Sequence, residues 1–141
     1  MKGTGHTAID TAPQVVAEWL NLLCDDLQWR EKGRAYLLLT ETLHALRDYL
    51  GVEEAAALGA QLPLIIRGIY YANWTPSKTP VHPRSKADFL ARVGGAFSRD
   101  PLENPERAVA AVFDLLRRKV SMGEIDHVSN AMRGPLHALW Q

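Results

Sequence analysis

The sequence predicts an all-α fold, a compact helical bundle within a single domain of 141 residues. Three observations carry this prediction. Apolar residues recur every three or four positions along the long segments, which is the period of an amphipathic helix. Two capping pairs, Ser85 with Asp88 and Ser121 with Glu124, mark helix starts. No segment shows the sustained alternation of β-branched residues that is typical of a strand.

The first half of the chain is expected to hold four helices. Thr11 can cap the first helix, with Pro13 in its first turn, and Gly51 ends the second. Pro63 separates the third from the fourth, because it lacks a backbone donor and disfavours helical geometry in the preceding residue. The expected helices cover about residues 12–27, 34–50, 52–60 and 63–72, after a flexible tail at residues 1–10.

The second half follows an extended connector at residues 72–84, in which Pro76, Pro80 and Pro83 disfavour a regular helix. Asn104 can cap a later helix that has Pro105 at its first position. The expected helices of this half are residues 85–97, 104–120 and 121–131, followed by a terminal turn that starts at Gly134.

The two halves align without a gap when the chain is shifted by 70 residues. Residues 17–20, Ala-Glu-Trp-Leu, then fall on residues 87–90, Ala-Asp-Phe-Leu, and helix starts, breaks and apolar stripes coincide further along. Sequence identity at this offset is no better than chance, so the coincidence of patterns carries the hypothesis. We therefore predict two pseudo-repeats, residues 14–71 and 85–141, whose apolar faces pack together in one core.

The charges balance overall but differ between the halves. Lys+Arg 16 and Asp+Glu 16 give a net charge of zero, which provides no global attraction to nucleic acid or to an anionic membrane. Residues 1–71 hold 6 basic and 9 acidic residues, net −3, and residues 72–141 hold 10 and 7, net +3. This asymmetry predicts either attraction between the two halves of one chain or head-to-tail association of two chains.

The expected location is the cytoplasm, without membrane association. The start of the sequence lacks the apolar core of a secretory signal. The longest apolar stretch, residues 62–71, is far shorter than the ~20 residues that span a bilayer. Cys24 is the single cysteine, and it is expected to be a small apolar core residue, because the neighbouring Asp25 and Asp26 disfavour a thiolate.

No metal or cofactor is expected. Glu41 and His44 have the Glu-x-x-His spacing used by di-iron bundles, but on a helical wheel both lie away from the apolar stripe. A second such pair is absent, since Ala111 and Asp114 occupy the matching positions. The histidines have no metal-ligand spacing, and no local catalytic motif occurs. The absence of these features favours a non-enzymatic protein, although enzymes can lack local motifs.

A second apolar surface is predicted on the helix at residues 34–50. Tyr36, Leu37 and Leu38 make this helix apolar nearly all round at one level, which indicates burial on a second side. The surface that covers it is either the other half of the domain or a partner chain. The leading interpretation is therefore a non-enzymatic protein-interaction or regulatory helical module that binds a protein partner or forms a homo-oligomer.

The alternative interpretation is a small-molecule-binding protein or an unrecognised enzyme with a pocket between the two halves. The polar and aromatic residues expected to line that pocket are Arg47, Arg67, Tyr70, Tyr71, Trp74 and His137. Trp74 lies among the prolines of the connector and has a second interpretation, as an apolar anchor that holds the connector on the bundle.

A third, weaker interpretation is non-specific nucleic-acid binding. One helix ends in a basic cluster, Arg117, Arg118 and Lys119. These side chains interact favourably with the helix dipole and increase solubility. The alternative is that they contact phosphate groups as an anion site. Sequence-specific DNA recognition is disfavoured. The presumed second helix of a helix-turn-helix, residues 53–61, has no Arg, Lys or Asn to read bases.

Several short blocks resemble one known family. They are Gln61-Leu62-Pro63, Arg67-Gly68-Ile69-Tyr70-Tyr71, Trp74-x-Pro76, Gly123-Glu124 and Leu139-Trp140. On these blocks the chain resembles the bacterial domain of unknown function 2267 family over about residues 14–141. It departs from the family at Met132-Arg133, where the family usually repeats Leu-Pro. The resemblance implies a small, soluble, helical bacterial protein, and it implies no activity, cofactor or catalytic residue.

Overall fold

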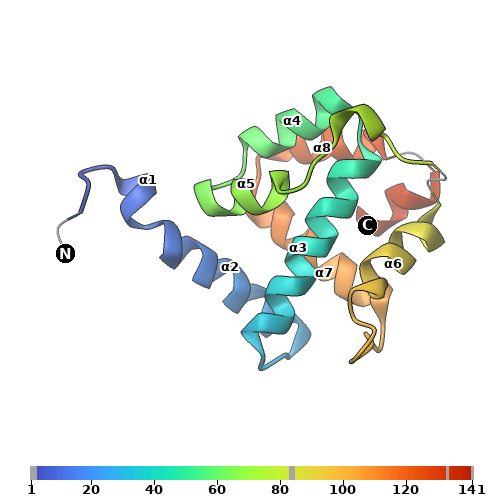
Figure 1. Ribbon diagram of the computed structural model, residues 1–141, viewed down its shortest axis with the longest axis horizontal. Coiled ribbons are helices and arrows are strands. Elements are labelled where there is room, and N and C mark those ends of the chain that lie inside the picture. Colours follow the sequence, from blue (N-terminus) through green and yellow to red (C-terminus); the bar gives the residue numbers. More distant parts are fainter. Residues whose placement is uncertain (1–2, 83–84, 133, 141) are drawn as a thin grey trace.

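A computed structural model of the protein describes residues 3–82, 85–132 and 134–140. In these residues it contains eight α-helices, two 3-10 helices and no strand (Figure 1). The predicted all-α fold class is therefore confirmed. The elements in chain order are α1 Thr7–Asp10, α2 Ala12–Leu27, α3 Lys32–Tyr49, α4 Val52–Ala60, α5 Leu64–Tyr71, η1 Pro76–Lys78, α6 Lys86–Gly95, α7 Pro105–Lys119, α8 Met122–Ala131 and η2 Gly134–Trp140.

Side-chain caps mark the starts of three helices, α6, α7 and α8. The hydroxyls of Ser85 and Ser121 accept the N–H of Asp88 and Glu124, and the Asn104 side chain accepts the N–H of Arg107. These three predicted caps are confirmed. Thr11 also occupies an N-cap position, but its hydroxyl instead donates to Thr7 O at 2.7 Å. The reason is that the one-turn helix α1 runs directly into α2.

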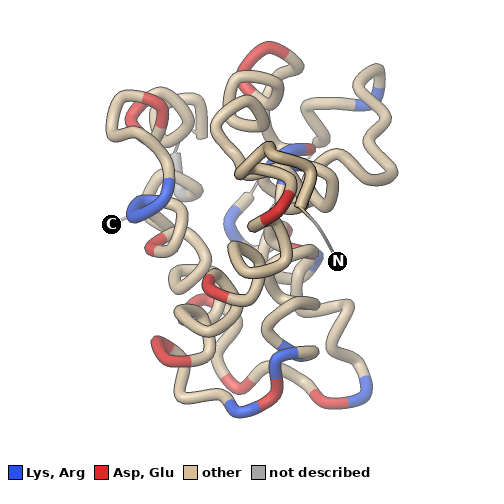
Figure 2. The backbone as a smooth tube through the Cα atoms, turned by 90° about the vertical axis from the view of Figure 1, so that its left-hand side faces the viewer, with Lys and Arg blue, Asp and Glu red and all other residues tan. Residues whose placement is uncertain are grey.

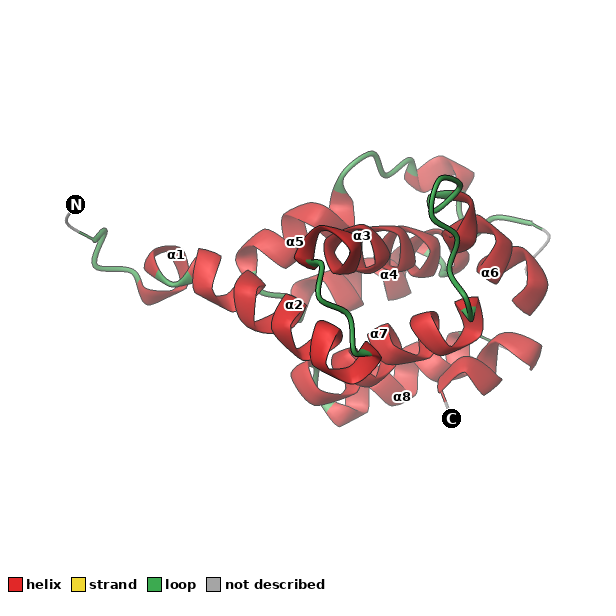
Figure 3. Ribbon diagram, turned by 90° about the horizontal axis from the view of Figure 1, so that it is seen from below, coloured by secondary structure: helices red, strands yellow, loops and turns green. Residues whose placement is uncertain are grey.

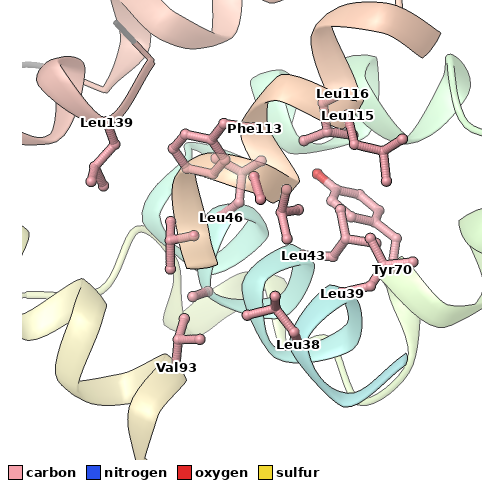
Figure 4. Close-up of a cluster of buried hydrophobic side chains, with 14 of the residues drawn as sticks. Leu38, Leu39, Leu43, Leu46, Tyr70, Val93, Phe113, Leu115, Leu116 and Leu139 are labelled. Atoms are coloured by element: carbon pink, nitrogen blue, oxygen red, sulfur yellow. The ribbon is translucent and has the colours of Figure 1, made fainter. Parts of the chain in front are cut away.

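The helices α3 and α7 lie at the centre of the bundle. α3 packs against α2, α5, α6 and α7, and α7 also packs against α2, α6, α8 and η2. Figure 4 shows buried side chains from before and after the connector in a single cluster, among them Leu46, Tyr70, Phe113 and Leu139. Each such large apolar side chain contributes ~1.5–3 kcal/mol when it is fully buried. Both halves of the chain therefore share one core.

The N-terminal arm extends away from this core. α1 and the first turns of α2 project to one side in Figures 1 and 3, and no residue of α1 is buried. Within the segment expected as a flexible tail, residues 7–10 form the single turn of α1. The Asp10 carboxylate accepts both the backbone N–H and the hydroxyl of Thr4, and these hydrogen bonds lower the pKa of Asp10.

The connector is held against the bundle. The N–H of Val81 donates to Asp48 O on α3 at 2.9 Å, and the ring of Trp74 lies 5.3 Å from the ring of Tyr71 on α5. The short helix η1 forms within the segment expected to be extended. Pro83 and Arg133, together with residues 1, 2, 84 and 141, lie outside the described residues.

Ion pairs join the two halves of the chain. Three of them match an acidic residue of the first half with a basic residue of the second: Glu18 with Lys119 at 2.8 Å, Asp26 with Arg107 at 2.8 Å, and Asp48 with Arg92 at 2.6 Å. Asp48 is the least exposed acid of the three and also pairs with Arg47. Burial acts to raise the pKa of Asp48, but the hydrogen bonds from the two arginines outweigh burial and lower it.

No helix among the described residues combines the length and the apolar content that crossing a membrane requires.

Candidate functional site

Two loops meet at one end of the bundle. Residues 28–31, between α2 and α3, and residues 96–104, between α6 and α7, lie at the bottom of Figure 1 and face the viewer in Figure 3. They line two hollows, of about 570 and about 480 Å³, that share Glu31, Arg34 and Asp100. Because the hollows adjoin at these residues, we treat them as one feature, the end groove. It is lined by residues 27–31, 33, 34, 37, 96–104, 107 and 108.

The chain enters the groove at Gln28, which has a left-handed backbone conformation. Gln28 has a φ of 57°, a conformation that few non-glycine residues adopt. It reverses the chain after α2, so that the N–H of Trp29 donates to Cys24 O at 2.9 Å. The side chain of Gln28 donates to Asp25 O at 2.7 Å and stabilises the turn. The polar stretch after α2 therefore places an aromatic ring, that of Trp29, against the bundle.

Arg34 joins the two loops. Its guanidinium donates to Asp100 O at 2.8 Å and to Pro101 O at 3.3 Å, and it lies 3.1 Å from the Asp100 carboxylate. Two aromatic rings flank it, with centroids 4.9 Å away for Trp29 and 5.0 Å away for Phe97. Each cation–π contact is worth ~0.5–1 kcal/mol at an exposed site. Arg34 is thus fixed in place at the centre of the groove.

The groove carries charges of both signs. Arg30, Arg34 and Arg107 line the larger hollow together with Glu31, Asp100 and Glu103. Figure 2 shows these alternating blue and red segments at the lower end of the chain. Arg107 donates to the Asp26 carboxylate at 2.8 Å, and this hydrogen bond raises the pKa of Arg107. The mixture of charges is suited to a partner with charges of both signs.

The predicted interaction surface divides into three environments. Leu38 is fully buried, and α3 packs against α6 on this side of the bundle, with Leu38 and Val93 in the same cluster (Figure 4). Leu37 is half-buried and lines the end groove with Phe97. Tyr36 is 46% exposed. The other half of the domain therefore covers Leu38, Leu37 lines the groove, and Tyr36 is exposed but is not among the residues that line the groove.

Most residues of the predicted pocket make contacts that hold the fold together. Arg47 is 2% exposed and donates to Tyr70 O and Ala72 O, both at 2.8 Å. Arg67 donates to carbonyls at the end of α4, and the Tyr70 hydroxyl donates to Ala55 O at 2.7 Å. Burial strongly raises the pKa of Tyr70. Together with Tyr71 and Trp74, these side chains fasten α3, α4, α5 and the connector to one another.

His137 lies apart from that group, at a polar hollow of about 350 Å³ that we name the α8 hollow. Its lining residues are Arg117, Ile125, Asp126, Ser129, Asn130, His137 and Trp140. His137 Nδ1 is 2.9 Å from Ser129 O and 3.1 Å from Ser129 Oγ. Both contacts use the same ring nitrogen, and the tautomer of His137 sets whether that nitrogen donates to the carbonyl or accepts from the hydroxyl.

The basic cluster at the end of α7 is largely paired. Arg117 lies 2.7 Å from the Asp114 carboxylate and 5.8 Å from the ring of Trp140, and Lys119 pairs with Glu18. Arg118 is exposed. Anion contact by Arg117 or Lys119 would have to compete with these carboxylates.

The described residues include no group of three or more His, Cys, Asp or Glu side chains that could hold a metal ion. Cys24 is buried. His44, expected to face away from the core, instead places Nε2 2.7 Å from Ile69 O on α5. The wheel argument was wrong for His44 because α3 is central and has helices on several sides.

Sequence reasoning missed the end groove. Arg34 and its partners Phe97 and Asp100 lie more than sixty residues apart in the chain, so no local pattern joins them. One local signal was available: Trp29 is an aromatic residue inside the charged segment 25–34.

Comparison with protein families gives a match over nearly the whole chain. The model of a family described as "Uncharacterized conserved protein (DUF2267)" matches residues 16–139, nearly the whole chain. A search of the curated proteins finds no match.

Proposed function

The chain belongs to the DUF2267 family of uncharacterized conserved proteins, and from this premise we propose that it is a non-enzymatic helical module that binds another protein through the end groove. The single observation that carries the proposal is the arrangement around Arg34. Arg34 is held between the half-buried Trp29 and the buried Phe97, with Leu37 in the same groove, and arginine and tryptophan are residue types that dominate binding energy at protein interfaces. Because the loops already fix Arg34, a partner pays little ordering entropy on binding it.

One observation supports a role without catalysis. Cys24 is 3% exposed, which disfavours its use as a nucleophile. The proposed setting is the bacterial cytoplasm, where a lone thiol such as that of Cys24 stays reduced. Neither a cofactor nor a sequence-specific nucleic-acid partner forms part of this proposal.

The partner is a different protein, or a second copy of the chain. Sedimentation velocity over a hundredfold range of concentration distinguishes these cases, and capture from lysate on immobilised protein identifies a different partner. Arg34→Lys is the test variant. Arg118→Lys is the matched control, because Arg118 is an exposed arginine outside the groove. The proposal expects capture or self-association to be lost in Arg34→Lys and kept in Arg118→Lys. A wild-type protein that is monomeric and binds no partner contradicts it.

We also propose that the fold contains an internal repeat, with residues 72–84 as the connector between its halves. At the offset of 70 residues, α2, α3, α4 and α5 correspond to α6, α7, α8 and η2. This exchange maps most packed pairs onto packed pairs: α2–α7 becomes α6–α3, α3–α5 becomes α7–η2, and α4–α5 becomes α8–η2. The pairs α2–α5 and α7–α8 depart from this pattern, because their counterparts α6–η2 and α3–α4 are less closely packed. The pairs α3–α7 and α4–α8 map onto themselves and are also packed. Such reciprocity supports a pseudo-twofold arrangement.

One hydrogen bond supports the repeat at the level of single residues. Arg67 Nε donates to Gly59 O at 3.0 Å in the first half. At the same offset, His137 Nδ1 lies 2.9 Å from Ser129 O in the second half. Two different side chains thus make the same contact between equivalent elements.

A further inference from the structure

The α8 hollow has a filled counterpart in the first half of the chain. At the offset of 70 residues, which rests on the proposed repeat, its lining residues Arg117, Asp126, Ser129, Asn130, His137 and Trp140 correspond to Arg47, Ala56, Gly59, Ala60, Arg67 and Tyr70. The two halves differ in what occupies the same space.

In the first half the space holds the guanidinium of Arg67. Its Nε donates to Gly59 O, and a terminal nitrogen donates to Ala60 O at 3.3 Å and to Leu62 O at 2.9 Å. Gly59 and Ala60 are the last two residues of α4 and Leu62 follows just after it, so the guanidinium lies at the negative end of the helix dipole. The Tyr71 ring closes the space further, because a methyl group on Gly59 would overlap its hydroxyl.

In the second half the shorter His137 side chain contacts Ser129, the equivalent of Gly59, and leaves the hollow of about 350 Å³ beside it. Ser129 and Asn130 bring the C-terminal end of α8 to this hollow. Asp126 adds a carboxylate where the first half has Ala56. Available space, a helix C-terminus and a carboxylate together favour a positively charged group with several N–H donors.

The one basic side chain that lines the described hollow does not reverse this preference. The Arg117 guanidinium is 2.7 Å from the Asp114 carboxylate, which offsets its charge. An anion in the hollow would meet the Asp126 carboxylate and the negative end of α8. A cation meets both favourably, with the ring of Trp140 nearby.

We propose that the α8 hollow binds a small organic cation that carries a guanidinium or amidinium group. The bound group takes the place that the Arg67 guanidinium occupies in the first half, donating to the Asn130 carbonyl and to the Asp126 carboxylate. A planar fork of N–H donors matches a carboxylate in two parallel hydrogen bonds.

The test uses the full chain at pH 7.5 and ethylguanidinium as the probe, with ethylurea as a neutral molecule of similar shape. Two-dimensional amide NMR follows residues 126–130 and the indole of Trp140. We expect a saturable shift with ethylguanidinium that is confined to the α8 hollow, and no saturable shift with ethylurea. Equal responses to the two probes, or shifts spread over the surface, would overturn the proposal.

Two variants and a control sharpen the test. Asp126→Asn should weaken ethylguanidinium binding about tenfold through the lost charge-assisted bond. Asp25→Asn makes the same charge change at an exposed position away from the hollow and should leave binding unchanged. His137→Arg restores the residue of the first half, so it should fill the hollow, abolish binding and raise the melting temperature. Unchanged binding by Asp126→Asn overturns the site even if His137→Arg does not fold.

The outcomes separate this site from the other proposals. Arg34→Lys at the end groove should leave ethylguanidinium binding intact, and Asp126→Asn should leave capture of a protein partner intact. A wild-type chain that binds no ethylguanidinium, while His137→Arg raises the melting temperature, would refute the ligand site and leave the repeat standing.

Discussion

Arg34→Lys removes the connection between the two loops of the end groove while it keeps the positive charge. The arginine donates to Asp100 O and Pro101 O and packs between the rings of Trp29 and Phe97. A lysine ammonium has a single nitrogen and no planar face, so it cannot reproduce both hydrogen bonds and both ring contacts. The variant therefore isolates the geometry of the guanidinium from its charge.

The expected loss of stability follows from these contacts. The side chain of Arg34 is 18% exposed, so its hydrogen bonds are only partly screened by water. Loss of one of the two bonds costs about 0.5–1.5 kcal/mol, and weaker ring contacts cost about 0.5 kcal/mol more. The pair with the Asp100 carboxylate, 80% exposed, adds little. A total of about 1–2 kcal/mol corresponds to a melting temperature about 3–8 °C lower.

Calorimetry measures this change, and the indole resonance of Trp29 reports whether the loop has moved. Arg99→Lys is the control, since Arg99 is exposed in the same groove and should change the unfolding free energy by no more than about 0.5 kcal/mol. If Arg34→Lys melts at the same temperature as Arg99→Lys and leaves the Trp29 resonance in place, Arg34 does not hold the loops together.

Three further predictions concern the fold. Hydrogen bonds from two arginines lower the pKa of Asp48, so its ionised carboxylate stabilises the fold. This contribution to the free energy of unfolding is complete above the usual pKa of carboxyl groups, and it is lost as the pH falls through the lowered pKa of Asp48. Urea titrations should therefore find Asp48→Asn about 1–3 kcal/mol less stable at pH 7, with a difference that shrinks below about pH 4; a pH-independent difference argues against the pairing. Gly59→Ala should destabilise the chain by about 1–3 kcal/mol in thermal melts, because the new methyl group displaces the Tyr71 ring. Helix propensity alone predicts stabilisation, and that result would contradict the close contact between Gly59 and Tyr71. Phe113→Leu should cost about 1–2 kcal/mol and reduce the near-ultraviolet circular dichroism, because the Phe113 ring stacks on Trp140 at 4.2 Å; an unchanged aromatic signal would show that the stack is absent.

Features set by neighbouring residues could be predicted from the sequence. Ser121, Asn104 and Pro63 act on the backbone within a few positions, so helix starts and the break between α4 and α5 agree closely with expectation. Thr11 differs, because the competing turn α1 lies just before it. At Thr11 the preceding turn ends only one residue earlier, and the hydroxyl bonds back to that turn instead of capping α2.

Features set by distant residues could not be predicted in the same way. A helical wheel assigns one buried face, but α3 contacts helices on several sides, and His44 is therefore bonded to Ile69 O. The end groove could be predicted only by knowing that Trp29 lies beside a loop about seventy residues later in the chain. The unequal division of charge predicted either attraction between the halves of one chain or head-to-tail association of two chains, and Asp26 with Arg107 is one ion pair that joins the halves within the chain.

Site-specific photo-crosslinking tests the central claim, partner binding at the end groove, most directly. A photoreactive residue replaces Glu103, which is exposed in the groove, or Lys78, which is exposed in η1 at the opposite end of the bundle (Figure 1). The proposed function predicts a discrete cross-linked product from position 103 that disappears when Arg34→Lys is added, and none from position 78. Equal products from both positions, or a product at position 103 that survives Arg34→Lys, would contradict it.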